Sequence, residues 1–402
     1  MKLLYIILDG LGDKPIKALQ NKTPLEAAIK PHFDELAAKA KLGLLYPVER
    51  GLAPESDVAT IALFGNNPFK CYKGRGPIEA FGFGIKLKKG DVALRCNFAY
   101  AESNILRNVR ASVTDKEAKV LAALISKKIK TIDSVKVIFK CTKGYRAVLV
   151  LRGKGLSPRI SNTHPGYGIY KNFVSSALPA RLGIPLQACR PLENTKEAVK
   201  TANVVNAFLE KANALLKKQN LAIITRGAGS NLPKLAKLQN WAALVDMPTE
   251  TALAKLMGMH IIKKAKNFDR LVLQVGKALK RYSAVYLHIK DTDVFSHNGD
   301  WKGKKDIIED FDKKFLAKFI RKNYLQNTIV CITGDHSTPC ETKAHSANPV
   351  PVLIYVPGEL GDCLRFGEAF AVKGTLGQLN GTRLFNVLMK LMLFESKAFI
   401  SL

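Results

Sequence analysis

The sequence predicts an α/β protein, with a core of mostly parallel β-sheet flanked by helices and a smaller α+β domain inserted into it. Short apolar runs alternate with helix-like stretches at the start of the chain and again in its last third. Several of these runs end directly on polar residues, which is typical of buried parallel strands with ligands beyond their carboxyl ends. A middle segment with a different pattern of strands and helices separates the two parts.

The first part of the chain begins with a continuous apolar run at residues 3–8, which predicts a buried strand ending at Asp9. Residues 23–26, Thr-Pro-Leu-Glu, have the form of a helix capping box. Residues 42–48 predict a second strand. Residues 54–63 predict a helix whose first turn carries Ser56.

The last third repeats this alternation of strand, polar residue, loop and helix. The expected strands are residues 284–289, 328–333 and 350–356, and an amphipathic helix at residues 383–393 closes the chain. The strand at 328–333 runs into Gly-Asp-His, so its end carries Asp335 and His336. These elements belong with the first part of the chain in one sheet.

The middle segment predicts a separate domain. It mixes expected strands at 135–141 and 146–152 with expected helices at 115–129 and 196–219. It lacks the polar clusters that bracket it. We therefore expect a discontinuous metal-binding core of residues 1–67 and 234–402, and an inserted substrate-binding domain of residues 68–233.

The net charge of +30 comes from 63 Lys and Arg against 33 Asp and Glu. Such a surface attracts anions, but the lysines occur as scattered pairs and not as one basic arm. No base-stacking motif of the kind that RNA binders carry accompanies them. We expect a small phosphorylated substrate as the partner and no nucleic acid; the sequence does not decide whether the chain forms a homo-oligomer.

The seven cysteines include no Cys-x-x-Cys pair, which indicates reduced thiols in a cytoplasmic protein. The apolar run at the N-terminus is too short for a signal peptide and ends on an aspartate. No stretch reaches the ~20 apolar residues needed to span a bilayer. We expect a cytoplasmic protein with no membrane partner.

The strongest chemical signal is a set of carboxylates and imidazoles at strand ends. Asp293 and His297 are four residues apart, which places them on one face of a helical turn. The remaining members are Asp9, Asp335, His336 and His345. Mixed carboxylate and imidazole ligands suit Zn²⁺, Mn²⁺ or iron better than Ca²⁺, and this set is large enough for two ions. Paired ions recur in enzymes that displace groups at phosphorus.

Ser56 is the candidate nucleophile. A serine hydroxyl needs a base or a metal ion to activate it, and a helix start offers N–H groups that favour a bound phosphate. The alternative is that Ser56 only caps the helix, which is the commoner role of serine in such a segment.

Three arginines of the middle segment, Arg75, Arg95 and Arg226, stand beside glycines or asparagine in the segments Gly-Arg-Gly-Pro, Arg-Cys-Asn-Phe and Thr-Arg-Gly-Ala-Gly. A guanidinium group can bind a carboxylate or a phosphate through two hydrogen bonds. The alternative is that they are surface arginines next to turn glycines.

Together these segments resemble one family. The resemblance is carried by residues 8–10, 23–28, 53–59, 74–80, 95–98, 336–340 and 345–352, which read LDG, TPLEAA, APESDVA, GRGPIEA, RCNF, HSTPC and HSANPVPV. The chain is similar nearly end to end to the archaeal type of cofactor-independent phosphoglycerate mutase, in the alkaline phosphatase superfamily.

The resemblance implies an alkaline-phosphatase-like core with an inserted cap domain, and interconversion of 3- and 2-phosphoglycerate through a phosphoserine. It implies no 2,3-bisphosphoglycerate cofactor and two divalent ions, with Mn²⁺ preferred and Mg²⁺, Co²⁺ or Zn²⁺ as alternatives. Carried over by motif, Asp9, Ser56, Asp335 and His336 would bind one ion. Asp293, His297 and His345 would bind the other. Lys290, Arg75, Arg95 and Arg226 would hold the phosphate and carboxylate of the substrate.

The chain departs from the family pattern around the substrate. An Asp-Pro-His motif appears as Thr163-His164-Pro165, and a lysine that usually precedes Gly-Ile-Ala-Lys is replaced by Thr251. These changes leave open a metal-dependent phosphomonoesterase, or a mutase for another phosphorylated metabolite. A second alternative, a non-catalytic nucleic-acid-binding relative, rests only on the charge.

Overall fold

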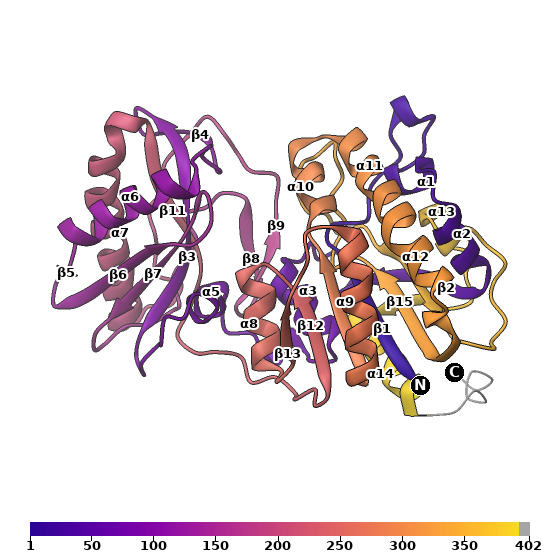
Figure 1. Ribbon diagram of the computed structural model, residues 1–402. Coiled ribbons are helices and arrows are strands. Elements are labelled where there is room, and N and C mark those ends of the chain that lie inside the picture. The colour runs from indigo at the N-terminus through magenta and orange to yellow at the C-terminus, as the bar shows by residue number, and fades with distance from the viewer. Residues whose placement is uncertain (394–402) are drawn as a thin grey trace. The chain divides into compact units, whose positions relative to one another are not determined.

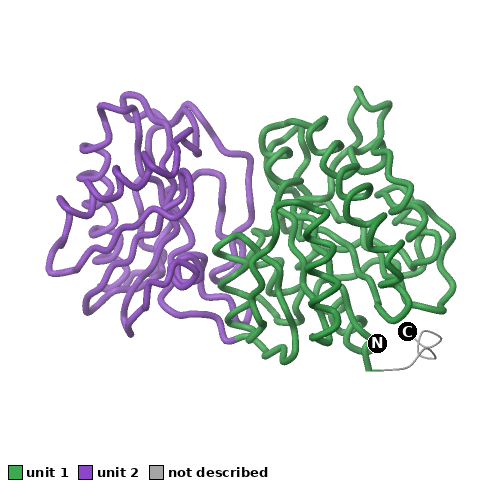
Figure 2. Tube along the Cα trace, viewed as in Figure 1, with its two compact units in different colours: residues 1–68, 235–402 green, residues 69–234 purple. Residues whose placement is uncertain are grey.

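The computed structural model describes residues 1–393, and it divides into two compact units (Figure 2). The first unit holds residues 1–68 and the chain from residue 235 onward, and the second holds residues 69–234. The second unit is thus inserted into the first. The boundaries lie one residue later than those expected from the sequence, and the functional roles assigned to the two parts remain predictions.

An eight-stranded sheet forms the first unit, in the order β13-β12-β14-β1-β15-β16-β2-β17 (Figure 1). In the described residues, β16 alone runs against the other strands, since it pairs antiparallel with both β15 and β2. The remaining pairings are parallel. This confirms the predicted class. The strands are β1 (Lys2–Leu8), β2 (Ala40–Tyr46), β12 (Trp241–Val245), β13 (His260–Lys263), β14 (Ala284–Ile289), β15 (Thr328–Thr333), β16 (Val350–Tyr355) and β17 (Gly377–Asn380).

Helices cover both faces of this sheet. On one face, Leu4 and Ile6 of β1 are buried in a core that includes Phe33 and Phe311; this face is covered by α2 (Pro31–Ala38), α9 (Phe268–Arg281), α11 (Trp301–Phe311) and α12 (Ala317–Arg321). On the other face, Tyr5 of β1 meets Phe64 edge to face at 5.5 Å; this face is covered by α3 (Ser56–Leu63), α8 (Pro248–Leu256) and α14 (Gly381–Leu393). Burial on both faces explains why β1 is a continuous apolar run.

The strand order brings the predicted site residues together beyond the carboxyl ends of the central strands. β14, β1 and β15 are neighbours and parallel, so the residues that follow them meet at the edge where their carboxyl ends lie. Because β16 runs the opposite way, the loop before it reaches the same edge and brings His345 there. The helices α3, α8 and α10 (Asp291–Asn298) follow β2, β12 and β14 in the chain and begin at this edge.

The second unit is built on an antiparallel sheet in the order β10-β4-β3-β7-β6-β5, with β11 beside β3. Its strands are β3 (Val92–Glu102), β4 (Ile105–Asn108), β5 (Thr131–Ile132), β6 (Val135–Cys141), β7 (Arg146–Arg152), β10 (Ile184–Pro185) and β11 (Leu221–Gly229). α6 (Asp115–Lys128) and α7 (Lys196–Leu216) pack on one face, and α5 (Arg75–Gly82) packs on the other. A hairpin of β8 (Tyr167–Lys171) and β9 (Val174–Ala177) forms a separate ribbon.

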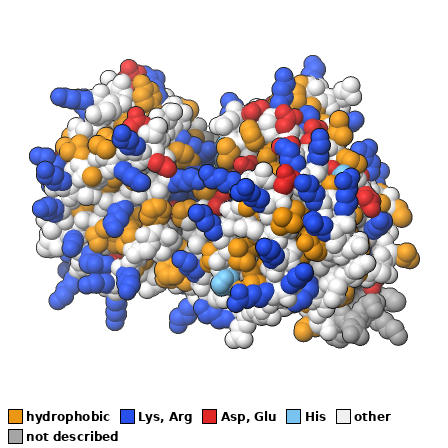
Figure 3. All heavy atoms as spheres, viewed as in Figure 1, with side chains coloured by type: hydrophobic (Ala, Val, Ile, Leu, Met, Phe, Trp, Pro, Cys, Tyr) orange, Lys and Arg blue, Asp and Glu red, His pale blue; other side chains and the backbone are white. Residues whose placement is uncertain are grey.

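The remaining α-helices of the described chain are short: α1 (Pro24–Ala27), α4 (Pro68–Cys71) and α13 (Glu368–Ala371). It also forms 3-10 turns η1 (Lys17–Leu19), η2 (Lys217–Gln219) and η4 (Tyr324–Asn327), and a π-helical segment η3 (Asp312–Leu316). The predicted capping box at Thr23 is present, with Thr23 and Glu26 bonding each other's backbone N–H. None of the helices formed by residues 1–393 combines the length and apolar character needed to cross a bilayer. Lysine and arginine side chains are spread over the face shown in Figure 3, in keeping with their scattered positions in the sequence.

Candidate active site

Ser56 is the first residue of α3 and does not cap it. Glu55 occupies the N-cap position, with an extended backbone at φ −77° and ψ 152° and no side-chain capping bond. The alternative that Ser56 serves only as a cap is therefore wrong. Its Oγ lies 3.1 Å from Nε2 of His336 in a buried setting. The hydroxyl thus stands where the N–H groups and dipole of the first helical turn favour a negative charge.

Asp9, Asp335 and His336 form a fully buried cluster beside Ser56. Nε2 of His336 lies 3.3 Å from Oδ1 of Asp9 and 3.4 Å from Oδ2 of Asp335. Neither of those two carboxylate oxygens has a hydrogen-bond partner. Buried carboxylate oxygens are costly to leave unpaired, so this cluster is built for a cation.

Asp293, His297 and His345 form a second cluster. Oδ1 of Asp293 lies 3.3 Å from Nε2 of His297 and 3.8 Å from Nε2 of His345. The other nitrogen of each ring lies 2.8 Å from a backbone carbonyl, that of Lys343 for His297 and that of Pro54 for His345. Each Nδ1–H therefore donates to a carbonyl, which turns the lone pair of Nε2 toward the cluster.

The spacing within both clusters fits shared metal ions. Two atoms bound to one ion at ~2.1 Å, with an angle of ~90–109° between the bonds, lie ~3.0–3.4 Å apart. Four of the contacts, at 3.1, 3.3, 3.3 and 3.4 Å, fall in this range, and the fifth, at 3.8 Å, lies slightly beyond it. The donor set of carboxylates, imidazoles and one hydroxyl, with no thiolate, suits Mn²⁺, Zn²⁺ or Co²⁺.

Lys290 links the two clusters. Its Nζ lies 2.7 Å from Oδ2 of Asp9 and 2.6 Å from Oδ2 of Asp293. Burial alone would lower the pKa of Lys290, but these two carboxylates outweigh it and raise that pKa above its usual value. Lys290 is thus a permanent positive charge next to both clusters.

The buried charges shift one another's pKa values. Burial works to raise the pKa of Asp9, but Lys290 and the neighbouring imidazoles outweigh burial and hold that pKa well below its usual range. Burial and the charge of Asp9 raise the pKa of Asp335. Burial, and next the charge of His336, lower the pKa of His345 well below its usual value, so His345 is a neutral ligand at pH 7.

A buried lysine fixes the loops that carry these ligands. Nζ of Lys304 donates to the carbonyls of Gly12 and Thr338 at 3.1 and 3.3 Å, and lies 2.9 Å from Oδ2 of Asp13. Asp13 also accepts from the backbone N–H of Cys340. The loop after β1 and the loop after β15 are thereby tied to α11.

Two of the three predicted arginines of the second unit contact one buried glutamate, and the third lies beside one of them. Glu79 of α5 pairs with Arg95, and its Oε1 lies 3.0 Å from Nε of Arg75. Arg226 of β11 is the register partner of Arg95 in β3, so both side chains emerge on the same face of the sheet. Despite burial, Arg95, Arg75 and Arg146 hold the pKa of Glu79 far below its usual value. One carboxylate among several guanidinium groups leaves an excess of positive charge, which suits an anion.

Close packing positions this cluster. A Cβ added at Gly76 would lie 2.1 Å from the carbonyl oxygen of Ala93, so only glycine lets the first turn of α5 rest on β3. The guanidinium of Arg226 stacks 3.9 Å from the ring centre of Tyr167. Burial and next the charge of Arg226 hold the pKa of His164 well below its usual value, so this residue is neutral here.

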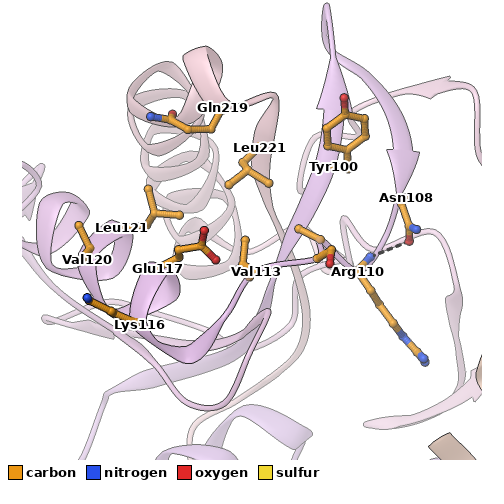
Figure 4. A pocket seen from close by; sticks show the side chains of 12 residues that line it. Tyr100, Asn108, Arg110, Val113, Lys116, Glu117, Val120, Leu121, Gln219 and Leu221 are labelled. Atoms are coloured by element: carbon orange, nitrogen blue, oxygen red, sulfur yellow. Dashed lines mark hydrogen bonds between the residues drawn. The ribbon is translucent and has the colours of Figure 1, made fainter.

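A pocket of about 800 Å³ also lies in the second unit, between α6, β3 and β4 (Figure 4). Its lining is mostly apolar, with Val113, Val120 and Leu121 among the residues that form it. Figure 4 shows the guanidinium of Arg110 pointing away from these side chains. None of the predicted site residues lines this pocket, so it is separate from the arginine cluster.

Known proteins are similar to this chain in sequence and in fold. A family model described as 2,3-bisphosphoglycerate-independent phosphoglycerate mutase matches residues 37–222. A protein of Methanocaldococcus jannaschii with that name is 34% identical, with 97% of either chain covered. One of Sulfolobus acidocaldarius is 35% identical, with 96% of either chain covered.

The chain belongs to the 2,3-bisphosphoglycerate-independent phosphoglycerate mutase family. Among solved structures, the cofactor-independent phosphoglycerate mutase of Thermoplasma acidophilum is 28% identical with a TM-score of 0.58, and the match covers 98% of this chain and 100% of that one. A protein of Pyrococcus horikoshii is 29% identical with a TM-score of 0.76, and the match covers 98% of both chains. The resemblance found in the motifs is confirmed.

Two residues that depart from the pattern of this mutase family, His164 and Thr251, lie near buried charged groups. His164 lies among the arginines of the second unit. Thr251 follows Glu250, which is buried within reach of Asp9 and His288. The prediction from sequence missed Glu250 and His288 as members of a cluster. His288 stands inside an apolar strand, two residues before Lys290, and so gave no signal of its own.

Proposed function

We propose that this chain interconverts 3-phosphoglycerate and 2-phosphoglycerate through a phosphoserine at Ser56, without 2,3-bisphosphoglycerate. The names of its relatives support the activity. The observation that carries the proposal is the position of Ser56, whose Oγ lies 3.1 Å from Nε2 of His336 at the start of a helix. A phosphoryl group on this oxygen would meet helix N–H groups and a buried cation-binding cluster.

The chain would bind two divalent ions, with Mn²⁺ preferred and Mg²⁺, Co²⁺ or Zn²⁺ as alternatives. Asp9, Ser56, Asp335 and His336 would hold one ion. Asp293, His297 and His345 would hold the other. When bound, such ions lower the pKa of the serine hydroxyl and withdraw charge from the phosphoryl oxygens.

The side chains of the protein carry out the transfer and hold the substrate. Oγ of Ser56 forms a bond to phosphorus while the bond to the glycerate oxygen breaks, and that oxygen takes up the proton that Ser56 lost. The neighbouring hydroxyl of the same glycerate then attacks phosphorus and the bond from phosphorus to Oγ of Ser56 breaks. Oγ takes up the proton that this hydroxyl loses, which restores Ser56. Lys290 balances negative charge on the transferring group. Its contacts with Asp9 and Asp293 hold its ammonium next to both clusters, where that group would lie. Arg75, Arg95 and Arg226 bind anionic groups of the substrate and retain the glycerate between the two steps.

The activity can be tested by incubating the full chain with 3-phosphoglycerate and Mn²⁺ and following the products by ³¹P NMR. We expect 2-phosphoglycerate to appear without added 2,3-bisphosphoglycerate. Ser56→Ala is the matched control and should give none. Release of inorganic phosphate faster than 2-phosphoglycerate forms would replace the mutase by a phosphomonoesterase.

A further inference from the structure

The apolar pocket of the second unit takes no part in the proposed reaction (Figure 4). Its volume of about 800 Å³ is in the range of cavities that hold small organic ligands. Val120 and Tyr100, which both line it, are 63% and 40% exposed. Uncovered apolar side chains that together line a concave surface mark a binding site for an apolar group.

The polar groups available to a ligand at this pocket are hydrogen-bond donors. Lys116 of α6 lines the pocket and carries an ammonium group. Asn108 accepts the backbone N–H of Arg110 through Oδ1 at 3.0 Å, which leaves its NH₂ group for a ligand. The carboxylate of Glu117 accepts the backbone N–H and the hydroxyl of Thr114 at 2.8 and 2.7 Å. An ammonium and an amide N–H at the rim of an apolar cavity favour an anionic group there.

Hydrogen bonds join the wall of the pocket to the arginine cluster of Arg75, Arg95 and Arg226. Segment 108–113 supplies much of the lining. Within it, the carbonyl of Val109 accepts from Nδ2 of Asn97 at 3.0 Å. Oδ1 of the same Asn97 accepts from Nε of Arg95 at 3.3 Å. A ligand that moves this segment would therefore also move Arg95.

The pocket and the arginine cluster lie on opposite faces of the same sheet. Tyr100 and Arg95 both belong to β3, and an odd number of residues separates them, so their side chains point to opposite faces. Their register partners in β11 are Leu221 for Tyr100 and Arg226 for Arg95. The two positions are ~17 Å apart along the strand. A small ligand in the pocket can thus affect the arginines only through the protein.

We propose that this pocket binds an amphipathic anion, and that the bound anion changes the affinity of the arginine cluster for its own anionic ligand. The apolar body of the molecule lies against the valine and leucine side chains of the lining, with its charged group toward Lys116. Segment 108–113 and Asn97 transmit the change to Arg95. The site takes part neither in metal binding nor in phosphoryl transfer, so it does not rest on the proposed function.

Binding of anilinonaphthalene sulfonate tests the site, because this probe has an aromatic body and one sulfonate and fluoresces in apolar surroundings. Full-length protein should bind it saturably, with one equivalent per chain. Val120→Trp fills the pocket and should abolish this binding, whereas Leu273→Trp, at an exposed position of α9 in the first unit, should not. Lys116→Gln should weaken it about 2–5-fold. Lys119→Gln, on α6 but outside the lining, should leave it unchanged.

The link to the arginine cluster is tested by repeating the titration with inorganic phosphate as the ligand of that cluster, against chloride at the same ionic strength. Coupling between two sites is reciprocal, so phosphate should change the affinity for the probe by roughly 5-fold or more. Asn97→Asp keeps the acceptor for Arg95 and removes the N–H that reaches Val109. This variant should still bind the probe and should lose the effect of phosphate.

The proposal is overturned if the wild type binds no probe saturably, if Val120→Trp binds it equally well, or if phosphate leaves the affinity for it unchanged. A dimer that Val120→Trp dissociates, detected by sedimentation velocity, would place a second copy of the chain in the pocket and would overturn it too. Circular dichroism confirms that each variant is folded. Ser112→Trp, which fills the pocket from segment 108–113, replaces Val120→Trp should the latter fail to fold.

Discussion

Oγ1 of Thr338 lies 2.9 Å from Nδ1 of His336. The same hydroxyl donates to Oδ1 of Asp293 at 3.0 Å, so its oxygen is left to accept the proton on Nδ1. His336 is thereby held in the tautomer whose Nε2 lone pair faces Ser56 and Asp9. One hydroxyl thus connects a ligand of the first cluster with a ligand of the second.

Thr338→Val should weaken metal binding while leaving the fold intact, because it keeps the shape of the side chain and removes the hydroxyl. Partners of this kind are typically worth about 10–100-fold in metal affinity or activity. Isothermal titration with Mn²⁺ measures the loss. Thr338→Ser keeps the hydroxyl and should recover most of the affinity; equal affinity in the valine variant and the wild type would remove Thr338 from this role.

The two clusters should lose their ions independently. Asp335→Asn removes a ligand of the first cluster only, and His345→Ala removes one of the second only. Each variant should bind one equivalent of Mn²⁺ less than the wild type. Mutase activity should fall by several orders of magnitude in both, since the remaining ion cannot replace the missing one. Near-wild-type turnover in either variant would contradict the ligand assignment.

The sequence was sufficient to predict the fold class and the outline of the site. Continuous apolar runs predicted strands within about two residues, because burial on both faces leaves few polar positions in them. Asp293 and His297 could be paired because α10 places residues four apart on one face. The seven predicted ligands meet in two clusters because of the strand order and the reversed direction of β16. Neither can be read from a single sequence.

The sequence did not predict site residues that lie outside any recognisable motif. Glu250 and Lys304 are charged residues inside helices, where a solvated position is the usual expectation. Both are buried: the loops after β1 and β15 pack over Lys304, and Glu250 lies beside Asp9 and His288. Such partners come from segments far apart in the chain.

Arg226→Ala should separate mutase activity from simple ester hydrolysis. If Arg226 retains the glycerate, the variant should lose roughly 30-fold or more in mutase activity, as removal of a charged contact costs ~2–5 kcal/mol. Hydrolysis of p-nitrophenyl phosphate should fall much less. Arg107→Ala serves as the control, because Arg107 is half exposed and pairs only loosely with Glu102 at 3.5 Å. An equal loss in both assays would point to a structural role for Arg226.

Stability should depend on pH through Glu368. Burial raises the pKa of Glu368 from 4.5 to about 7, despite the hydrogen bond that it accepts from Thr23 at 2.7 Å. The folded protein thus holds this proton more tightly than the unfolded chain. The resulting stabilisation is complete below pH 4.5 and is lost as the pH rises through 7.

Glu368→Gln keeps a neutral side chain at every pH and should therefore not lose this contribution. Urea unfolding between pH 5 and 8 should show the wild type losing roughly 1–3 kcal/mol relative to the variant as the pH rises. Parallel pH profiles for the two proteins would show that Glu368 ionises normally in the folded state.

The proposed reaction passes through a phosphoserine at Ser56, which mass spectrometry of the enzyme quenched during turnover can detect. Enzyme mixed with 3-phosphoglycerate and Mn²⁺ is stopped with acid, digested and analysed for phosphopeptides. We expect phosphate on the peptide that contains Ser56, absent when substrate is omitted and absent in Ser56→Ala. Sustained mutase activity in Ser56→Ala, or turnover with phosphate only on another residue, would contradict it.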